Sequence, residues 1–318
     1  MRPLSAAFEP YSWALSTVAI ARLAGVEPRE VLRFDGNTPP RPLPTSTAAA
    51  LADELGRVNA YPHGGYPRIH EAIAEYAGVE PENVVLGAGA DDLIMLVARS
   101  FAGPGDTVFV ADEPTYPVLR GAAWLAGAEV GESDPVLTFC CRPHNPTGAL
   151  VDLPSARPLA VDEAYFEYAG GETAAGLLDD GVVVIRTFSK AFALAGARIG
   201  YALAARDVAE ELRVRQSPAP VSTLSVALAL AALDAGPPDV SETVEERERL
   251  AERLRELGLE PLRTFTNFVF VPVAEPEHVY EALLRRALAV RPVAGGIRIT
   301  VRTRGDDERL LQALARVC

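Results

Sequence analysis

One stretch decides the fold and the chemistry expected of this chain: Thr187-Phe188-Ser189-Lys190-Ala191-Phe192-Ala193-Leu194-Ala195-Gly196-Ala197-Arg198-Ile199-Gly200-Tyr201. Lys190 is the only lysine in the sequence, so every other member of the 30 lysines and arginines is an arginine. Arginine serves solubility, ion pairing and anion binding, but its guanidinium stays protonated. A lysine amine can lose its proton and form an imine with an aldehyde. The presence of this one lysine therefore indicates lysine chemistry at Lys190. The alternative is that Lys190 is a surface residue that is present by chance.

Length, composition and charge limit the possible functions. A chain of 318 residues, 49% of them hydrophobic, can form one large domain or two smaller ones. No apolar run reaches the ~18 residues that cross a bilayer, and the N-terminus lacks the apolar core of a signal peptide. The net charge of −13 argues against binding nucleic acid or an anionic membrane, and three cysteines form no disulfide framework. We therefore expect a cytoplasmic protein without membrane or nucleic-acid partners, and we assign it no metal site.

Short apolar runs alternate with helical patterns from residue 83 onward. The apolar runs predict strands at 84–86, 107–111, 136–140, 159–162, 182–187 and 199–204. Helices are expected between the first of them, at 92–101 and 116–126. Such alternation is typical of a largely parallel sheet covered on both faces. We therefore expect an α/β protein whose large domain has three layers, α/β/α, around a mostly parallel sheet.

Longer helices follow residue 205 and predict a smaller α/β domain. Helices are expected at 206–214, 221–235, 240–257, 277–287 and 306–315, and strands at 267–273 and 297–301. The N-terminal segment is expected to join this unit. The predicted division is a large domain over 45–215 and a small domain made of 1–44 and 216–318.

Polar residues follow several predicted strands, where ligands collect in a parallel sheet. These positions are Gly89-Ala90-Asp91, Tyr116, Asn145, Asp162 and Thr187 to Lys190. Each has an ordinary explanation when taken alone, such as a turn or a helix cap. Together they suit a phosphate, because a helix N-terminus, the hydroxyls of Thr187 and Ser189 and the guanidinium of Arg198 all bind anions.

The other strand-end residues suit an aromatic ring. Asp162 can hold a pyridinium N–H, and Asn145 and Tyr165 can hydrogen-bond a phenolate oxygen. Tyr116 can stack on a flat ring, and Lys190 offers an amine to an aldehyde. Phosphate, pyridine nitrogen, phenolate and aldehyde together describe pyridoxal 5′-phosphate (PLP).

Three motifs resemble those of the fold-type I PLP-dependent aminotransferases of class I/II, most closely the histidinol-phosphate aminotransferase group. They are Thr187 through Gly196 with Arg198-Ile199-Gly200, Asn145-Pro146-Thr147-Gly148 and Asp162-Glu163-Ala164-Tyr165. The resemblance covers residues 35–318. It implies the fold of that family, a PLP cofactor, and Lys190 as the residue that holds the cofactor as an imine.

The resemblance also implies roles for the other site residues. Asp162 pairs with the ring nitrogen and takes part in catalysis with Lys190 and Tyr165. Asn145 and Tyr165 contact the ring oxygen, and Tyr116 stacks on the ring. The residues of the phosphate cup are Gly89, Ala90, Asp91, Thr187, Ser189 and Arg198. Tyr61 matches a tyrosine that reaches the phosphate in the partner subunit, which implies a homodimer with shared active sites.

The substrate end of the site differs from the family pattern. Arg298 and Asn145 are expected to bind the substrate, with Arg298 holding its carboxylate or phosphate; the alternative for Arg298 is a surface charge on a strand. The histidinol-phosphate group has a second arginine where this chain has Pro272. Arg302 would share a face of an alternating strand with Arg298 and could replace the lost charge.

The connection between Asn145 and Asp162 is short. It contains Pro154 and Pro158 and has little room for the helix that the family places there. We therefore expect that helix to be missing or reduced to a turn.

The expected function is a PLP-dependent aminotransferase, a transaminase. It would move an amino group between a 2-oxo acid such as 2-oxoglutarate and an amino acid or amino-alcohol phosphate, either histidinol-phosphate-like or aromatic. One alternative is a PLP-dependent decarboxylase of a phosphorylated amino acid, similar to threonine-phosphate decarboxylase. Another is a PLP-binding regulator, but about 45 residues before the core and the acidic charge do not suit a DNA-binding domain.

Overall fold

Two compact units make up the computed structural model, which describes residues 5–40, 42, 44–62 and 64–317. The first unit comprises Met1–Pro10, Arg41–Arg142 and Val151–Pro238. The second comprises Tyr11–Pro40, Pro143–Leu150 and Asp239–Cys318. The chain passes between the two units several times, so each is built from segments that lie far apart in the sequence.

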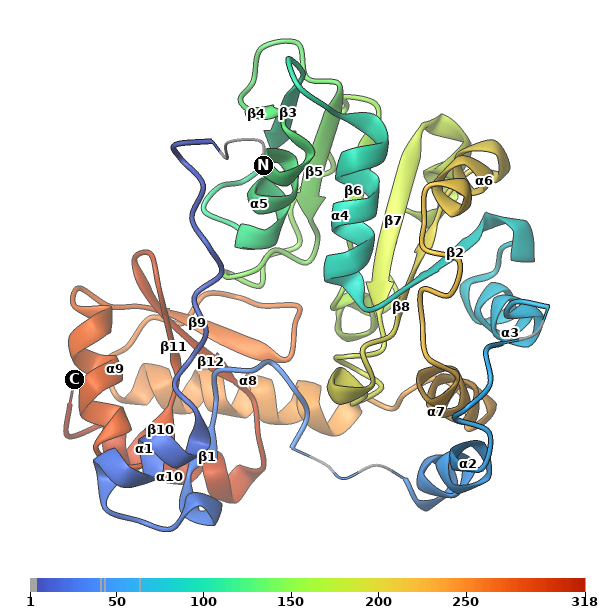
Figure 1. The fold of residues 1–318 in the computed structure, drawn as a ribbon. Coiled ribbons are helices and arrows are strands. Elements are labelled where there is room, and N and C mark those ends of the chain that lie inside the picture. Colours follow the sequence, from blue (N-terminus) through green and yellow to red (C-terminus); the bar gives the residue numbers. More distant parts are fainter. Residues whose placement is uncertain (1–4, 41, 43, 63, 318) are drawn as a thin grey trace. The chain divides into compact units, whose positions relative to one another are not determined.

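A seven-stranded sheet forms the centre of the first unit, with the strand order β2-β8-β7-β6-β5-β3-β4 (Figure 1). In that order the strands are Val84–Gly87, Gly200–Leu203, Val182–Thr187, Leu159–Asp162, Leu137–Cys141, Thr107–Val110 and Glu129–Val130. Only β8 runs antiparallel to its neighbours. Strands β2, β5, β6, β7 and β8 are buried on both faces, as the continuous apolar runs predict. The predicted, mostly parallel sheet is confirmed.

Helices cover both faces of this sheet. Apolar side chains of α4 (Ala90–Phe101), α5 (Pro117–Ala126) and α6 (Arg206–Val214) pack against one face. Those of α3 (Pro67–Ala77) and α7 (Thr223–Asp234) pack against the other, and α2 (Thr45–Leu55) contacts α7. Helices α3 and α5 begin with proline and end at a left-handed glycine, the usual start and stop signals. The three-layer prediction is confirmed.

The connection from β5 to β6 contains no helix. The two strands pair in parallel, with Cys141 opposite Asp162, and residues 142–158 between them form turns and irregular chain. Arg142 holds the end of this connection because its Nε donates to the Val151 carbonyl oxygen at 2.8 Å. The expectation that the usual helix is missing or reduced to a turn is therefore confirmed.

Two small sheets and four α-helices make up most of the described part of the second unit. The three-stranded sheet is antiparallel, and the strand pair β1–β10 is parallel. The strands are β9 (Phe268–Pro272), β11 (Arg291–Val293), β12 (Gly296–Thr300), β1 (Leu32–Arg33) and β10 (Leu288–Ala289). The helices are α1 (Thr17–Ala24), α8 (Ser241–Glu256), α9 (Pro276–Leu284) and α10 (Arg304–Leu314). Leucine, valine and isoleucine side chains of both sheets and of α8, α9 and α10 share one core.

The two units separate in the chain between Pro238 and Asp239, so α7 belongs to the first unit. The division between residues 215 and 216, which the longer helices after residue 205 predict, stays a prediction. Across the described residues, none of the helices combines the length and the apolar character that crossing a membrane demands.

Candidate active site

The residues predicted to form the phosphate cup lie where α4 begins in the first unit. Gly89 precedes the helix with φ of 89°, and a Cβ on it would lie 2.6 Å from Nη2 of Arg198. Arg198 itself has left-handed backbone angles, φ 49° and ψ 61°, which are uncommon outside glycine and often mark functional positions. The guanidinium lies 3.4 Å from both the Ser189 hydroxyl and the Asp91 carboxylate. The backbone thus brings a guanidinium against a helix N-terminus, an arrangement that suits a phosphate.

The two hydroxyls predicted for this cup lie next to each other. Thr187 Oγ1 donates to Ser189 Oγ at 2.9 Å, and the Ser189 amide donates back to Thr187 Oγ1 at 3.1 Å. Tyr116, at the start of α5, donates its hydroxyl proton to Asp91 Oδ1 at 2.8 Å. The structure therefore brings Asp91, Tyr116, Thr187, Ser189 and Arg198 together, as the sequence predicted.

Asp162 is a buried carboxyl group at the end of β6. Its Oδ1 accepts from the Ala164 amide at 3.1 Å, and the thiol of Cys141 lies 3.9 Å from Oδ2. Burial raises the pKa of Asp162 to about 7, and the charge of Asp91 adds to the rise, whereas the Ala164 hydrogen bond and Lys190 oppose it. A cation placed against this carboxyl would favour its charged form and lower the pKa again. A protonated pyridine nitrogen is a cation of this kind.

Tyr165 and Lys190 come together from the turns that follow β6 and β7. Tyr165 is buried and caps the short 3-10 helix Phe166–Ala169. Lys190 Nζ lies 5.6 Å from the centre of the Tyr165 ring. Because β6 and β7 are parallel neighbours, their carboxyl ends lie at the same edge of the sheet. That edge therefore presents an amine, a phenol and a buried carboxyl group within one unit.

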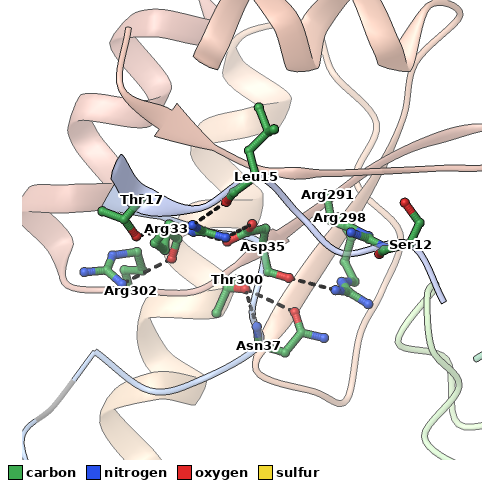
Figure 2. Close-up of polar contacts among 10 residues, drawn as sticks. All are labelled: Ser12, Leu15, Thr17, Arg33, Asp35, Asn37, Arg291, Arg298, Thr300 and Arg302. Carbon is green, nitrogen blue, oxygen red and sulfur yellow. Dashed lines mark hydrogen bonds and ion pairs between the residues drawn. The ribbon is translucent and has the colours of Figure 1, made fainter. Parts of the chain in front are cut away.

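Arg298 and Asn145 form a second predicted cluster, in the second unit. Arg298 lies on β12 and donates through Nη1 to Asn145 Oδ1 at 2.7 Å. Its Nη2 donates to the Asp35 carbonyl oxygen at 3.0 Å (Figure 2). The guanidinium also lies 5.4 Å from the centre of the Phe268 ring. Arg298 is therefore held on several sides, which excludes the alternative of a loose surface charge.

The expectation that Arg302 shares a strand face with Arg298 is wrong. Strand β12 ends at Thr300, and the chain then turns to the N-cap of α10 at Thr303. Arg302 Nε pairs with Asp306 at 3.0 Å, and Nη1 donates to the Arg33 carbonyl oxygen at 3.2 Å. Figure 2 shows the Arg302 and Arg298 guanidinium groups apart from each other. The residue binds α10 and β1, which argues against its predicted contact with substrate.

Arg291 is a candidate site residue that the sequence motifs do not indicate. It lies on β11 directly opposite Arg298 in the antiparallel pair, so both side chains project from the same face of the sheet. Its Nη2 donates to the Ser12 carbonyl oxygen at 3.0 Å, and its guanidinium lies 6.0 Å from the centre of the Tyr11 ring. The signal was available in Gly295-Gly296, which separates two apolar runs in the manner of a hairpin turn.

Tyr61 lies in the loop between α2 and α3 and is 81% exposed. It borders a cavity of about 600 Å³ in the first unit, between α2, α7 and the loop that contains Tyr66. Its predicted contact with a partner subunit stays a prediction.

The residues of the first unit fit PLP. The α4 N-terminus with Arg198 and two hydroxyls suits the phosphate, and the missing Cβ of Gly89 leaves room beside the guanidinium. Asp162 has the buried carboxyl group that a pyridinium nitrogen requires, and Lys190 has the amine that the aldehyde requires.

Comparison with known proteins identifies the family. Residues 29–134 and 131–317 match the family model described as aminotransferase class I and II. A histidinol-phosphate aminotransferase of Staphylococcus haemolyticus is 32% identical, over 97% of this chain and 96% of that protein. A putative aminotransferase of Burkholderia pseudomallei has a similar structure, with a TM-score of 0.81 and 26% identity over 90% of this chain and 98% of the other.

A further solved structure supports the fold. The histidinol-phosphate aminotransferase of Sinorhizobium meliloti, in complex with PLP, has a TM-score of 0.83 and 24% identity, over 98% of this chain and 97% of the other. The chain therefore belongs to the class I and II aminotransferases, the fold-type I PLP enzymes that transfer an amino group between an amino donor and an oxo acid, and within them it lies near the histidinol-phosphate aminotransferase group.

Proposed function

We propose that Lys190, Asp162 and Tyr165 form the catalytic centre of this aminotransferase. One observation carries the proposal: Lys190 Nζ lies 5.6 Å from the Tyr165 ring, at the same sheet edge as the buried carboxyl group of Asp162. Asp162 is the last residue of β6, Tyr165 lies in the turn that follows β6, and Lys190 lies in the turn that follows β7. The functional groups therefore share a rigid support.

The proposed cofactor contacts follow from the chemistry of each group. The backbone amides of Ala90 and Asp91, with Thr187, Ser189 and Arg198, bind the phosphate at the start of α4. The Asp91 carboxylate pairs with Arg198, so it is the amide of Asp91 that serves the phosphate. The ring contacts are Asp162 at the nitrogen, Asn145 and Tyr165 at the oxygen and Tyr116 on the ring face.

Lys190 and Asp162 are the groups that hold or move protons. When bound, PLP supplies an aldehyde carbon for the amino group and a ring that accepts negative charge from the substrate Cα. Lys190 Nζ acts as the general base that takes the proton from that Cα. Asp162 would hold a proton on the pyridine nitrogen, because a cationic N–H would stabilise its carboxylate in a site where burial is the main cause that raises its pKa to about 7.

Arg298 holds the anionic end of the substrate in this proposal, with Asn145 beside it. A guanidinium offers parallel donors to a carboxylate or a phosphate. Arg291 adds a second positive charge on the same sheet face, in a chain that has Pro272 in place of the usual second arginine. The donor is an amino acid or amino-alcohol phosphate, histidinol-phosphate-like or aromatic, and the acceptor is a 2-oxo acid such as 2-oxoglutarate. The similarity to histidinol-phosphate aminotransferases supports the phosphorylated donor.

The decarboxylase alternative has less support, because two relatives that are each 32% identical over at least 94% of this chain are histidinol-phosphate aminotransferases. The two reactions differ in their products. Amino transfer converts a 2-oxo acid into an amino acid, whereas decarboxylation releases CO₂ and leaves the amino group on the product.

We also propose a cytoplasmic homodimer, in which Tyr61 of each subunit reaches the phosphate in the other. The exposure of Tyr61 supports this role, and the buried thiols of Cys140 and Cys141 suit a reducing compartment. All of the residues proposed to bind the cofactor fall within 45–215, which supports that stretch as the PLP-binding domain.

A donor panel tests the proposal. The PLP-loaded protein is mixed with histidinol phosphate, aromatic amino acids or phosphothreonine, and both the change in cofactor absorbance and the release of CO₂ are recorded. We expect amino transfer with histidinol phosphate or an aromatic donor and no CO₂ release. In Lys190→Ala both amino transfer and the visible absorbance band of the unaltered protein should disappear, and persistence of either would overturn the assignment of Lys190.

A further inference from the structure

A buried ion pair lies directly behind the strand ends that carry the proposed catalytic residues. Arg186 Nε donates to Glu163 Oε2 at 3.0 Å, and the two side chains are 3% and 0% exposed. Both side chains make further hydrogen bonds. Glu163 accepts from the Ala174 amide at 2.5 Å and from the Thr173 hydroxyl at 2.8 Å, and Arg186 Nη2 contacts the same hydroxyl at 2.6 Å.

The guanidinium of Arg186 contacts both ends of the turn over residues 163–166. Besides Glu163, it contacts Phe166, with its central carbon 3.7 Å from the centre of the ring. Glu163 and Phe166 flank Ala164 and Tyr165, and the Phe166 amide donates to the Glu163 carbonyl oxygen at 3.1 Å. The position of Tyr165 is therefore set by contacts on both of its flanks.

The same pair connects the two strands that end at the site. Glu163 directly follows Asp162 at the end of β6, and Arg186 directly precedes Thr187 at the end of β7. The Glu163 amide also donates to the Ile185 carbonyl oxygen at 2.8 Å. Successive residues of a strand point to opposite faces, so the pair braces the strand ends from the face opposite Asp162 and Thr187.

Stability alone does not require an ion pair at this place. Apolar residues of similar volume often stabilise a buried site as well or better, because they carry no desolvation cost. A charged pair differs from apolar residues because its contacts are directional. Several hydrogen bonds of fixed geometry hold the turn in one position.

We infer that Glu163 and Arg186 are positioning residues, which fix the Tyr165 hydroxyl and the Asp162 carboxyl group relative to Lys190. The inference rests on the proposed roles of those three residues. It assigns a function in the reaction to two side chains that touch neither cofactor nor substrate.

The experiment follows the visible absorbance of the PLP-loaded protein with pH, together with its thermal unfolding. The variants are Tyr165→Phe, Arg186→Met and the double variant Glu163→Gln with Arg186→Met. The double variant removes both charges, so the net charge is unchanged, and the Glu163→Gln side chain retains an acceptor for the Ala174 amide. Val182→Ala, at the far end of β7 in the same core, is the control for loss of stability alone.

We expect Tyr165→Phe to move the pH midpoint of the absorbance change by about one unit, the effect of one hydrogen bond to the ring oxygen. Both Arg186 variants should move it in the same direction by about half a unit. Arg186→Met alone should lower Tm by about 10 °C, because it leaves a buried carboxylate without its cation, and the double variant should recover more than half of that loss. Val182→Ala should lower Tm and leave the midpoint in place.

The outcomes distinguish a failure of the inference about Glu163 and Arg186 from a failure of the proposed function. If Tyr165→Phe moves the midpoint and the double variant does not, Glu163 and Arg186 only stabilise the fold; the inference is wrong and the proposed function stands. If Tyr165→Phe itself leaves the midpoint in place, the proposed role of Tyr165 is wrong and the inference falls with it. A midpoint shift in Val182→Ala as large as that in the double variant would also overturn the inference, because loss of stability alone would then produce it.

Discussion

The first and second units place their proposed functional side chains by different means. In the first, Asp162, Tyr165 and Lys190 follow two neighbouring parallel strands, so a single sheet edge collects them. In the second, Arg298 and Arg291 lie within the strands of a hairpin and donate to backbone carbonyl oxygens of an N-terminal segment remote in sequence. A site at parallel strand ends depends on the order of elements, whereas a site within a hairpin depends on register and on non-local contacts.

The largest expected effect comes from the sheet edge of the first unit. Asp162→Asn keeps the shape of the side chain but removes the charge that would hold a proton on the pyridine nitrogen. We expect kcat/KM to fall at least a thousandfold, about 4 kcal/mol of transition-state stabilisation. Steady-state kinetics measure it, with the exposed Asp179→Asn of the same unit as the control. A loss below tenfold would contradict the proposed role of Asp162.

One buried carboxyl group in each unit should make the stability of the folded state depend on pH. Burial raises the pKa of Asp162 from 3.8 to about 7. Burial, with the hydrogen bond and charge of Glu246, raises the pKa of Asp307 to about 8. Because the folded state favours the protonated form, the stability from each group is full below about pH 4 and is lost as the pH rises through its folded pKa.

For the apoprotein we expect Asp162 to account for about 4 kcal/mol of the free energy of unfolding that is lost between pH 4 and 8. Thermal unfolding across this range measures it, as the difference between the unaltered protein and Asp162→Asn. PLP should abolish the contribution of Asp162, since a pyridinium would stabilise the carboxylate, and leave that of Asp307 in place. If PLP changed the pH dependence of unfolding equally in Asp162→Asn and Asp307→Asn, the proposal that only Asp162 pairs with the cofactor would be contradicted.

The arginine hairpin of the second unit should act mainly on substrate binding. Arg298→Lys loses the paired donors of the guanidinium, and we expect kcat/KM to fall about a hundredfold, mostly through KM. Arg291→Lys should cost about tenfold, because Arg291 adds charge beside the principal contact. The exposed Arg285→Lys is the matched control in the same unit. A change in kcat alone for Arg298→Lys would place Arg298 outside substrate binding.

Arg302 provides the smallest expected effect and the sharpest test of the hairpin geometry. Its partner Asp306 lies in the first turn of α10, and the two side chains are 18% and 21% exposed. Arg302→Ala should therefore lower the free energy of unfolding by about 1 kcal/mol and change KM less than about twofold. A tenfold rise in KM would restore the hypothesis that Arg302 replaces the arginine absent at Pro272.

The sequence predicts the sheet edge well for physical reasons. Strands buried on both faces require continuous apolar runs, and these runs mark where each strand ends and hence where Asp162 and Lys190 lie. The missing helix after Asn145 follows from chain length and prolines. These signals are local, so they can be read without knowledge of distant parts of the chain.

The hairpin and the N-terminal segment that it binds could not be predicted in the same way. Strand β1 pairs with β10, more than half of the chain away, and both strands contain only two residues. The placement of Arg302 depends on where β12 stops, which its bond to Asp306 helps to fix and which apolar alternation does not show. The placement of Arg291 depends on cross-strand register. Each of these features is set by contacts between segments remote in sequence.

The single lysine gives the protein its own spectroscopic probe. Growth on isotopically labelled lysine would place one labelled side chain in each copy of the chain, at the proposed reacting amine beside Tyr165. Nuclear magnetic resonance of that side chain would then report its protonation and its bonding to PLP as one resolved signal, with no assignment problem and no change to the sequence. Conversely, any cellular modification directed at lysine side chains has one target in this chain, and that target is Lys190.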